Sequence, residues 1–210
     1  MEKPVFKNLR PLILASASPR RRDFLTKLGL QFLVETAVVD ESALPDEAPE
    51  AFVRRLASEK ARAVATHHPD HVVLGADTIV VRDGVLLGKP VSRQQAKEIL
   101  TSLSGRWHEV WTGFSICCQE SHLEEVGAVV TRVRFAGLDP GVIAAYVASG
   151  DGDDKAGAYG IQSGGGFLVS EISGSYTNVI GLPVAEVVAA LVKVEALEVA
   201  GPSCRKRTQK

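Results

Sequence analysis

Apolar residues recur along this chain with two different spacings, and the two spacings alternate. Continuous apolar runs predict buried strands at residues 12–15, 72–76, 79–81, 108–118 and 126–135. Apolar residues three or four positions apart predict helices that begin at Pro19, near Pro49, after Ser92, at Pro140 and at Pro183. Strands and helices that alternate in this way indicate an α/β fold with a central, mixed sheet flanked by helices.

Two hairpins complete the predicted sheet. Asp83-Gly84 is a strong turn signal, and it joins residues 79–81 to an apolar segment at residues 85–87. Near the end of the chain, residues 167–172 and 176–180 predict a closing hairpin around a Ser-Gly-Ser turn.

Two charged residues interrupt apolar faces. Lys60 lies on the apolar stripe of the helix over residues 49–66, four positions after Leu56, so it must either extend to solvent or meet an anion. Asp77 lies inside the apolar run 72–81, where a carboxylate is costly to bury without a partner. A structural hydrogen-bond acceptor, a metal ligand and a general base all remain open for Asp77.

The segment from Ser16 to Arg22 has the composition of an anion site. Ser18 suits a helix N-cap and Pro19 the first helical position, so hydroxyls and arginines gather at a helix N-terminus. Backbone amides, hydroxyls and guanidinium groups together suit phosphate. A capped helix with solvated arginines is an equally good interpretation of this segment.

Other polar residues lie in predicted loops. Residues 150–166 form a 17-residue segment with seven glycines, and a loop of that length inside a compact domain favours a functional role. It carries Asp154, Lys155, Tyr159 and Gln162, whose planar amide could read a base edge. Elsewhere, we expect Glu41 just after a strand, as a second carboxylate, and Lys89 just after the strand at residues 85–88.

Composition limits the classes of partner. The 24 Lys and Arg residues balance 25 Asp and Glu residues, which argues against nucleic acid, and 45% apolar residues exclude long disorder. We expect residues 1–200 to form a single domain and the basic residues 201–210 a disordered tail. Reduced cysteines, no signal-peptide core and no membrane-length apolar run predict a cytoplasmic protein without a membrane partner.

Several common catalytic motifs are absent. The chain has no GxxxxGK[ST] loop, no GxGxxG, no HExxH and no GxSxG. The five histidines fall mostly in predicted turns or on predicted surfaces, which disfavours a histidine-based mechanism. From the residues alone, the chain is an α/β protein with a cationic phosphate pocket and an internal aspartate.

Seven short motifs, in a consistent order over about residues 11–195, resemble the Maf family of nucleoside triphosphate pyrophosphatases. They are Ala15-Ser-Ala-Ser-Pro-Arg-Arg21, Glu59-Lys60-Ala61, Gly75-Ala-Asp77-Thr78, Gly88-Lys89-Pro90, Leu103-Ser-Gly-Arg106, Asp154-Lys-Ala-Gly-Ala-Tyr-Gly-Ile-Gln162 and Gly181-Leu-Pro183. The resemblance implies the elongated fold shared with inosine triphosphate pyrophosphatases, with a central twisted mixed sheet. It also implies a homodimer.

The resemblance further implies hydrolysis of a nucleoside triphosphate between its α and β phosphates, with a divalent metal cation, Mg²⁺ or Mn²⁺. Arg20, Thr78 and the segment ending at Gln162 resemble the branch that acts on dTTP and UTP, including modified pyrimidine triphosphates. A nucleotide-binding regulator of cell division without turnover, 7-methyl-GTP specificity and a purely structural α/β module remain alternatives.

Roles carry over only where residues match the family motifs. Asp77 matches the proton acceptor, and Arg20, Thr78 and Gln162 match the positions that set substrate specificity. The phosphate-binding positions are matched by Ser16, Arg21, Lys60 and Lys89, and a carboxylate near the metal is matched by Glu41. Two departures affect loop geometry: Ser163 stands where a glycine is usual, and Gly152-Asp153 replaces a commoner proline-containing approach to Asp154.

Overall fold

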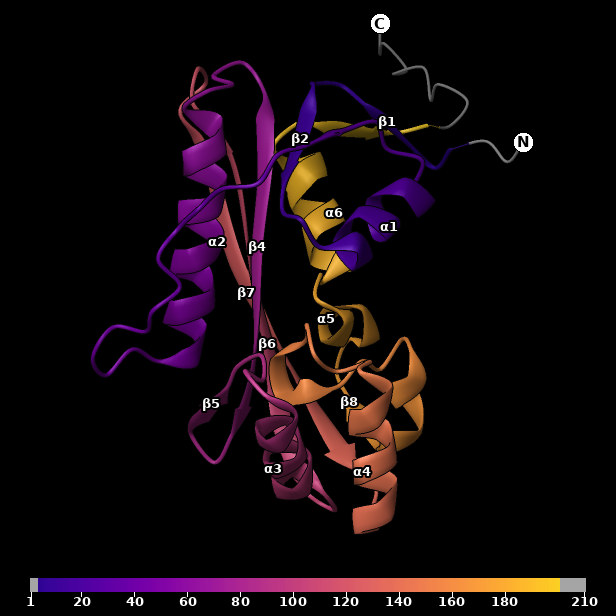
Figure 1. The fold of residues 1–210 in the computed structure, drawn as a ribbon. Helices are drawn as coiled ribbons and strands as arrows, with labels where there is room; N and C mark the ends of the chain where they lie inside the picture. Colours follow the sequence, from indigo (N-terminus) through magenta and orange to yellow (C-terminus); the bar gives the residue numbers. More distant parts are fainter. Residues whose placement is uncertain (1–3, 201–210) are drawn as a thin grey trace, which may run out of the picture.

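The structure is a computed structural model that describes residues 4–200, and it consists of one large sheet with helices on both faces (Figure 1). The strands are β1 (Phe6–Asn8), β2 (Leu12–Ala15), β3 (Leu33–Val34), β4 (Val72–Arg82), β5 (Val85–Leu87), β6 (Trp107–Cys118), β7 (Leu123–Phe135), β8 (Val169–Ser173) and β9 (Leu197–Val199). The helices are α1 (Pro19–Lys27), α2 (Pro49–Ala65), α3 (Arg93–Leu103), α4 (Pro140–Ser149), α5 (Tyr176–Ile180) and α6 (Val184–Lys193), with short 3-10 helices η1 (Ala156–Ala158) and η2 (Gly164–Leu168).

The large sheet is mixed, as the alternation of strands and helices predicted. Its order is β3-β2-β4-β6-β7-β8, and β5 pairs with β4 beside this path. β2 runs parallel to both β3 and β4, whereas the remaining pairs in the sheet are antiparallel. A separate antiparallel ribbon joins β1 to β9.

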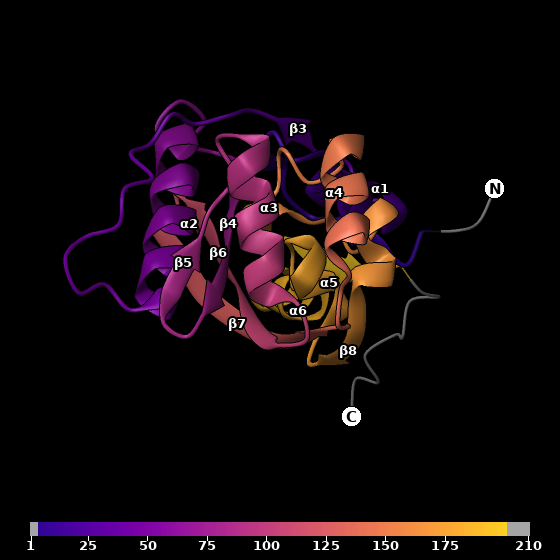
Figure 2. The ribbon, with the colours of Figure 1, turned by 60° about the horizontal axis from the view of Figure 1, so that its bottom comes forward.

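The helices form layers on the two faces of the sheet. α2 packs on β4 and β6 on one face, and α1, α5 and α6 lie on the other (Figure 1). α3 and α4 lie side by side at the end of the molecule near β5 (Figure 2). No helix within residues 4–200 is both long enough and apolar enough to cross a membrane.

Glycines in the strands allow α2 to approach the sheet closely. A Cβ at Gly75 would lie 2.3 Å from the Ala57 carbonyl oxygen, and one at Gly113 would lie 2.2 Å from the Val53 carbonyl oxygen. A larger side chain at either position would therefore push the helix away from the strands. This close packing sets the register of α2 on β4 and with it the position of Lys60.

Two apolar clusters occupy the face of the sheet opposite α2. One joins β2, β4 and β6 to α1 and α6, and the other joins the far ends of β4, β6 and β7 to α3 and α4. Three threonines and an asparagine lie between the clusters and are hydrogen-bonded to one another or to nearby backbone: Thr78, Thr112, Thr131 and Asn178. The apolar core on this face is thus divided by a polar band at mid-strand.

The expected closing hairpin is wrong in its second half, because residues 176–180 form helix α5. Ser175 caps that helix by accepting a hydrogen bond from the Asn178 amide at 3.3 Å. The buried Asn178 side chain then donates to the Val110 carbonyl and to Thr131 Oγ1, each at 3.0 Å. These tertiary contacts override the strand propensity of the segment's valine, isoleucine, tyrosine and threonine.

Two further expectations need correction. Glu41 does not follow a strand directly, because β3 ends at Val34 and residues 35–48 form an irregular segment up to α2. The expectation that the histidines lie mostly in turns or on surfaces does not hold for His108, which is buried on β6 with 2% of its surface exposed.

The two cysteines that the structure describes agree with the prediction of reduced thiols. Cys117 and Cys118 are free and buried. Cys204 and the basic tail at residues 201–210 lie outside the described residues.

Candidate active site

A cavity of about 1000 Å³ opens beside the middle of β4. β2 pairs with β4 only as far as Gly75, and β5 begins to pair with it at Val80, so residues 76–79 have no strand neighbour on that side. Asp77 and Thr78 lie in this gap. The cavity is lined by all nine residues that the sequence singled out: Ser16, Arg20, Arg21, Glu41, Lys60, Asp77, Thr78, Lys89 and Gln162.

The inward-facing lysine of α2 meets two carboxylates. Lys60 Nζ lies 2.7 Å from Asp77 Oδ1 and 2.6 Å from Glu41 Oε1. The side chains of Lys60 and Asp77 are only 12% and 13% exposed, so each charge compensates the burial of the other. The hydrogen bond from Lys60 also holds the pKa of Glu41 below its usual value. Lys60 therefore meets an anion, the second of the two outcomes that its position allowed.

Arg21 is bound by protein acceptors on three sides. Its Nε donates to the Gly181 carbonyl at 2.8 Å, and its Nη1 donates to the Ala76 carbonyl at 2.8 Å and to Ser16 Oγ at 3.0 Å. Its Nη2 donates to Thr78 Oγ1 at 3.0 Å. Burial lowers the pKa of Arg21, while the charge of Asp77 opposes that effect. Arg21 thus ties α1 to the unpaired edge of β4 and to the α5–α6 connection, with its charge at the cavity wall.

The Thr78 hydroxyl is part of the polar band on the sheet. It accepts from Arg21 and lies 3.0 Å from Thr112 Oγ1, which donates to the Asn178 carbonyl at 3.1 Å. The same hydroxyl lies 3.4 Å from the Gly181 carbonyl. Its position is consequently fixed by partners on three other segments of the chain.

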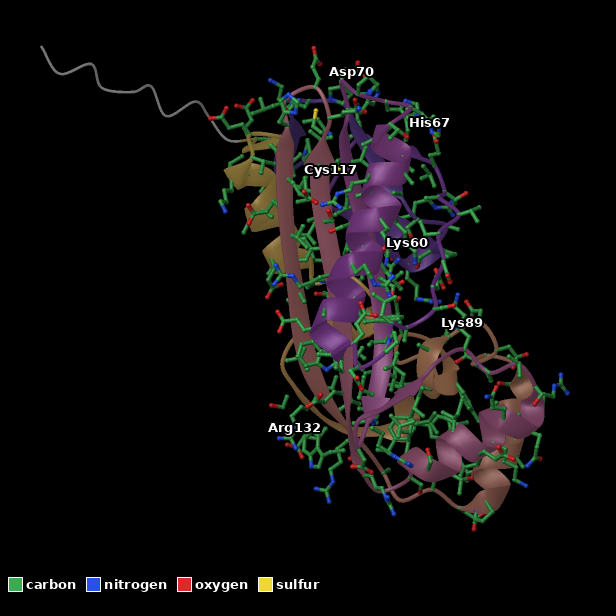
Figure 3. The ribbon with its side chains drawn as sticks, turned by 90° about the vertical axis from the view of Figure 1, so that its left-hand side faces the viewer. Lys60, His67, Asp70, Lys89, Cys117 and Arg132 are labelled. Atoms are coloured by element: carbon green, nitrogen blue, oxygen red, sulfur yellow. The ribbon has the colours of Figure 1, made fainter. Side chains whose placement is uncertain are left out.

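Three predicted site residues lie toward the opening of the cavity. Arg20, with 31% of its side chain exposed, forms an ion pair with Asp154 at 3.3 Å. Lys89 follows β5, where the Gly88 carbonyl accepts a hydrogen bond from the Gly157 amide at 3.1 Å. Gln162 is exposed on the glycine-rich segment 150–166. In Figure 3, Lys60 on α2 and Lys89 lie on the right-hand side of the molecule, and Arg132 lies on the left.

The sequence indicated Tyr159 only as a member of the glycine-rich segment and gave no role to His108. In the structure His108 Nε2 lies 2.9 Å from the Tyr159 hydroxyl, and both rings pack edge-on against Phe135. Burial lowers the pKa of His108 to about 4 and raises the pKa of Tyr159. His108 is neutral at physiological pH and supports a tyrosine in the cavity wall.

Sequence reasoning also missed the cavity's apolar lining. Phe52 and Leu56 line it from α2, together with Ile79 from β4. Phe52 and Leu56 share a helical stripe with Lys60 at intervals of four residues, so the stripe was the signal that could have placed them there.

The cavity offers few protein ligands for a divalent cation. Asp77 and Glu41 contact the same lysine nitrogen, so two carboxylates lie within reach of one point in the cavity. Within residues 4–200 no group of three or more His, Cys, Asp and Glu residues is arranged to hold a metal. Mg²⁺ is commonly held by one or two carboxylates together with substrate phosphates and water. The residues present fit a cation shared with a phosphate ligand.

Comparisons with known proteins agree on one family. A family model described as "Maf-like protein" matches residues 11–194. A Desulfotalea psychrophila protein named dTTP/UTP pyrophosphatase is 47% identical over 195 residues, 93% of this chain and all of that protein. A Myxococcus xanthus protein of the same name is 50% identical over 180 residues, 86% of this chain and 90% of that protein.

Solved structures that resemble the chain are more distant. A HAM1 protein from Coxiella burnetii is 17% identical with a TM-score of 0.49, covering 88% of this chain and all of that one. The Ham1 protein of Staphylococcus aureus is 15% identical with a TM-score of 0.43, covering 60% and 72%.

Proposed function

The chain belongs to the Maf family, and from this premise we propose that it hydrolyses dTTP and UTP to the nucleoside monophosphate and pyrophosphate. The observation that carries the proposal is the buried pair of Lys60 and Asp77 at the unpaired edge of β4, with Glu41 bound to the same lysine. Relatives named dTTP/UTP pyrophosphatase match about nine-tenths of the chain and support the choice of substrate.

Asp77 is the proton acceptor in this proposal. A water molecule attacks phosphorus in the α–β linkage, its proton passes to an Asp77 carboxylate oxygen, and the bond to the leaving phosphate oxygen breaks. If water attacks the α phosphorus, its oxygen ends on the nucleoside monophosphate. If water attacks the β phosphorus, its oxygen ends on pyrophosphate. A correctly placed carboxylate base contributes about 10²- to 10⁴-fold in rate.

Ser16, Arg21, Lys60 and Lys89 hold the triphosphate in the part of the cavity that we call the phosphate end. Fixed cations there are aimed at the negative charge that develops on the attacked phosphorus and on the pyrophosphate. Because the Arg21 side chain already bonds protein acceptors at the cavity wall, it acts as a charge held in place before the substrate arrives.

A divalent cation is the proposed cofactor, and Glu41 is the residue that would hold it, together with substrate phosphates and water. When bound, such an ion supplies Lewis-acid neutralisation of phosphate charge. In this arrangement Lys60 keeps its contact with the carboxylates or turns to a phosphate oxygen, because its ammonium has three donors.

Arg20, Thr78 and Gln162 are the proposed specificity residues, and the part of the cavity around Arg20 and Gln162 is here called the base end. An exposed amide such as that of Gln162 offers a donor and an acceptor side by side, which matches the edge of a pyrimidine base. We also propose a homodimer, which light scattering on the purified protein tests. The cytoplasmic location stays a prediction from the sequence.

The experiment is a panel of triphosphates with Mg²⁺ or Mn²⁺, read out as pyrophosphate release. Release from dTTP and UTP, with the monophosphate as the other product, supports the proposal. Turnover of 7-methyl-GTP in preference to both would replace it with the other branch of the family. Tight nucleotide binding with no pyrophosphate release would favour a regulator without turnover, and no nucleotide-dependent rise in melting temperature would favour a structural module.

A further inference from the structure

The glycine-rich segment 150–166 is folded around one carboxylate. Asp151 Oδ2 accepts a hydrogen bond from the Tyr146 hydroxyl at 2.6 Å and another from the Ser163 hydroxyl at 2.8 Å. The Tyr146 oxygen in turn accepts from the Gly160 amide at 3.1 Å. One carboxylate therefore joins the start of the segment to its far end, and we call Tyr146, Asp151 and Ser163 the clasp.

The clasp continues to a residue of the base end. Lys155 Nζ donates to the Asp151 carbonyl and to Asp154 Oδ1, the latter at 2.6 Å. The other oxygen of Asp154 pairs with Arg20 at 3.3 Å. Both Arg20 and Gln162 are thus attached to the same hydrogen-bonded network, although they are far apart in the sequence.

The negative charge of Asp151 determines that the two hydroxyl groups of the clasp act as donors. Burial opposes ionisation of Asp151, yet the hydrogen bonds from Ser163 and Tyr146 and the charge of Lys155 bring its pKa below the usual value. Burial and the neighbouring Asp151 raise the pKa of Tyr146. Near neutral pH Asp151 is an anion and both hydroxyls are donors, so the clasp is a pair of charge-assisted hydrogen bonds.

Ser163 distinguishes this chain from the usual motif, in which a glycine follows the matched glutamine. Glycine has no hydroxyl and leaves the backbone freer, whereas Ser163 bonds both Asp151 and, at 3.2 Å, the Gly160 carbonyl. Gln162 is the residue immediately before it. The extra bond restrains the backbone from which the Gln162 side chain projects into the cavity.

We propose that Ser163 and Asp151 are positioning residues that hold Gln162 for discrimination between uracil and cytosine. The inference rests on the proposed function and deepens it. Uracil and cytosine present donor and acceptor groups in opposite order at two adjacent ring positions, N3 and C4, and an amide that rotates freely satisfies either order. An amide carried on a restrained backbone favours one order, and the wrong base leaves polar groups unpaired.

The test compares UTP with CTP in a Ser163→Ala variant. We expect the ratio of kcat/KM for UTP to kcat/KM for CTP to fall about tenfold. This is the effect of losing about one hydrogen bond that distinguishes the two bases. KM for UTP should rise while kcat stays within about twofold, because no clasp residue contacts Lys60 or Asp77 in the structure.

Two matched variants act as controls. Ser163→Thr keeps the hydroxyl and should restore the wild-type ratio. Ser170→Ala removes a hydroxyl on β8 that donates to the Arg134 carbonyl on β7. Inhibition by inorganic tripolyphosphate, which has no base, should be the same in every variant. Asp151→Asn should reproduce the Ser163→Ala ratio, and amide hydrogen exchange at residues 160–163 should quicken in both.

Three results would overturn the clasp proposal: an unchanged ratio in Ser163→Ala, an equal loss for UTP, CTP and tripolyphosphate binding, or failure of Ser163→Thr to restore the ratio. Should the wild-type protein release no pyrophosphate from UTP, the proposed function fails instead. Calorimetric affinities for UMP and CMP then test the clasp by the same ratio.

Discussion

At the phosphate end of the cavity Lys60 and Asp77 come from the interiors of α2 and β4, whereas at the base end Gln162 comes from an irregular segment of 17 residues. Lys60 and Asp77 are held by a helix packed on a strand at close range, with Gly75 permitting the approach. Arg20 and Gln162 depend on side-chain hydrogen bonds around Asp151. The first arrangement resists rearrangement, because moving either charge requires moving a regular element.

In the proposed function, reaction and recognition rest on different kinds of structure. Lys60 and Asp77, which act on the triphosphate, lie on elements that tolerate little change in the core. Gln162, which recognises the base, lies on a segment whose shape follows from a few polar contacts. Substitutions at the two ends should therefore differ in kind, with losses of rate or stability at one end and changes of preference at the other.

The largest effect is expected for Asp77→Asn, which keeps the size of the side chain but removes the base. Pyrophosphate release should fall by about 10²- to 10⁴-fold, because the amide cannot accept the proton. Calorimetric affinity for UMP should change less than threefold, since the base end is untouched. Asp83→Asn, in the exposed turn after β4, is the matched control and should keep full activity. Retained turnover in Asp77→Asn would remove the distinction between the two ends.

A second large effect is expected on stability for Lys60→Met. Asp77 then loses its partner while remaining in the cavity wall, and the free energy of unfolding should fall by about 3 kcal/mol. The double variant Lys60→Met/Asp77→Asn should recover at least half of that loss in urea denaturation, because the only carboxylate left without its lysine is the exposed Glu41. Lys97→Met on the exposed face of α3 serves as the control. A double variant as unstable as the single one would contradict the proposed pairing energy.

The smallest effect concerns pH and the support of the base end. His108 has a pKa of about 4 in the folded state against 6.5 in its ordinary range, so the unfolded chain binds its proton more readily between those values. Stability should therefore fall as the pH drops below about 6.5, and His108 should account for about 2 kcal/mol between pH 7.5 and pH 5.

The measurement is urea denaturation of His108→Leu at the same two pH values. The variant should be less stable near neutral pH, because Tyr159 loses its partner, but its stability should change less on acidification. His67→Gln, which alters a histidine that is 73% exposed, should keep the wild-type pH dependence. Equal pH dependence of stability in His108→Leu and the wild type would show that protonation of His108 does not cause the loss of stability on acidification.

Periodicity predicted the individual residues of the phosphate end but not their contact. Lys60 was recognisable because it lies on an apolar stripe, and Asp77 because it interrupts an apolar run. Their ion pair depends on the register of α2 on β4, which is fixed by close packing at Gly75 and Gly113 rather than by any local pattern. Predicting each helix and strand separately from the sequence does not give the register of one on another.

The remaining structure depended on contacts that local patterns do not encode. The segment Tyr176–Ile180 is rich in strand-favouring residues, yet it forms a helix. From this helix the Asn178 side chain donates to the Val110 carbonyl and to Thr131. In the glycine-rich segment the backbone has no repeating geometry, so the sequence predicted a functional loop without predicting that Ser163 would meet Asp151. The length of this loop could be predicted from the sequence, but its conformation could not.

The ribbon of β1 and β9 bears on how the chain is completed during synthesis. It pairs residue 6 with residue 199, so the first strand of the described chain is made long before its partner. Until residues 197–199 leave the ribosome, Phe6–Asn8 expose an unpaired edge to other chains. Residues 197–199 thereby protect a strand that was synthesised much earlier.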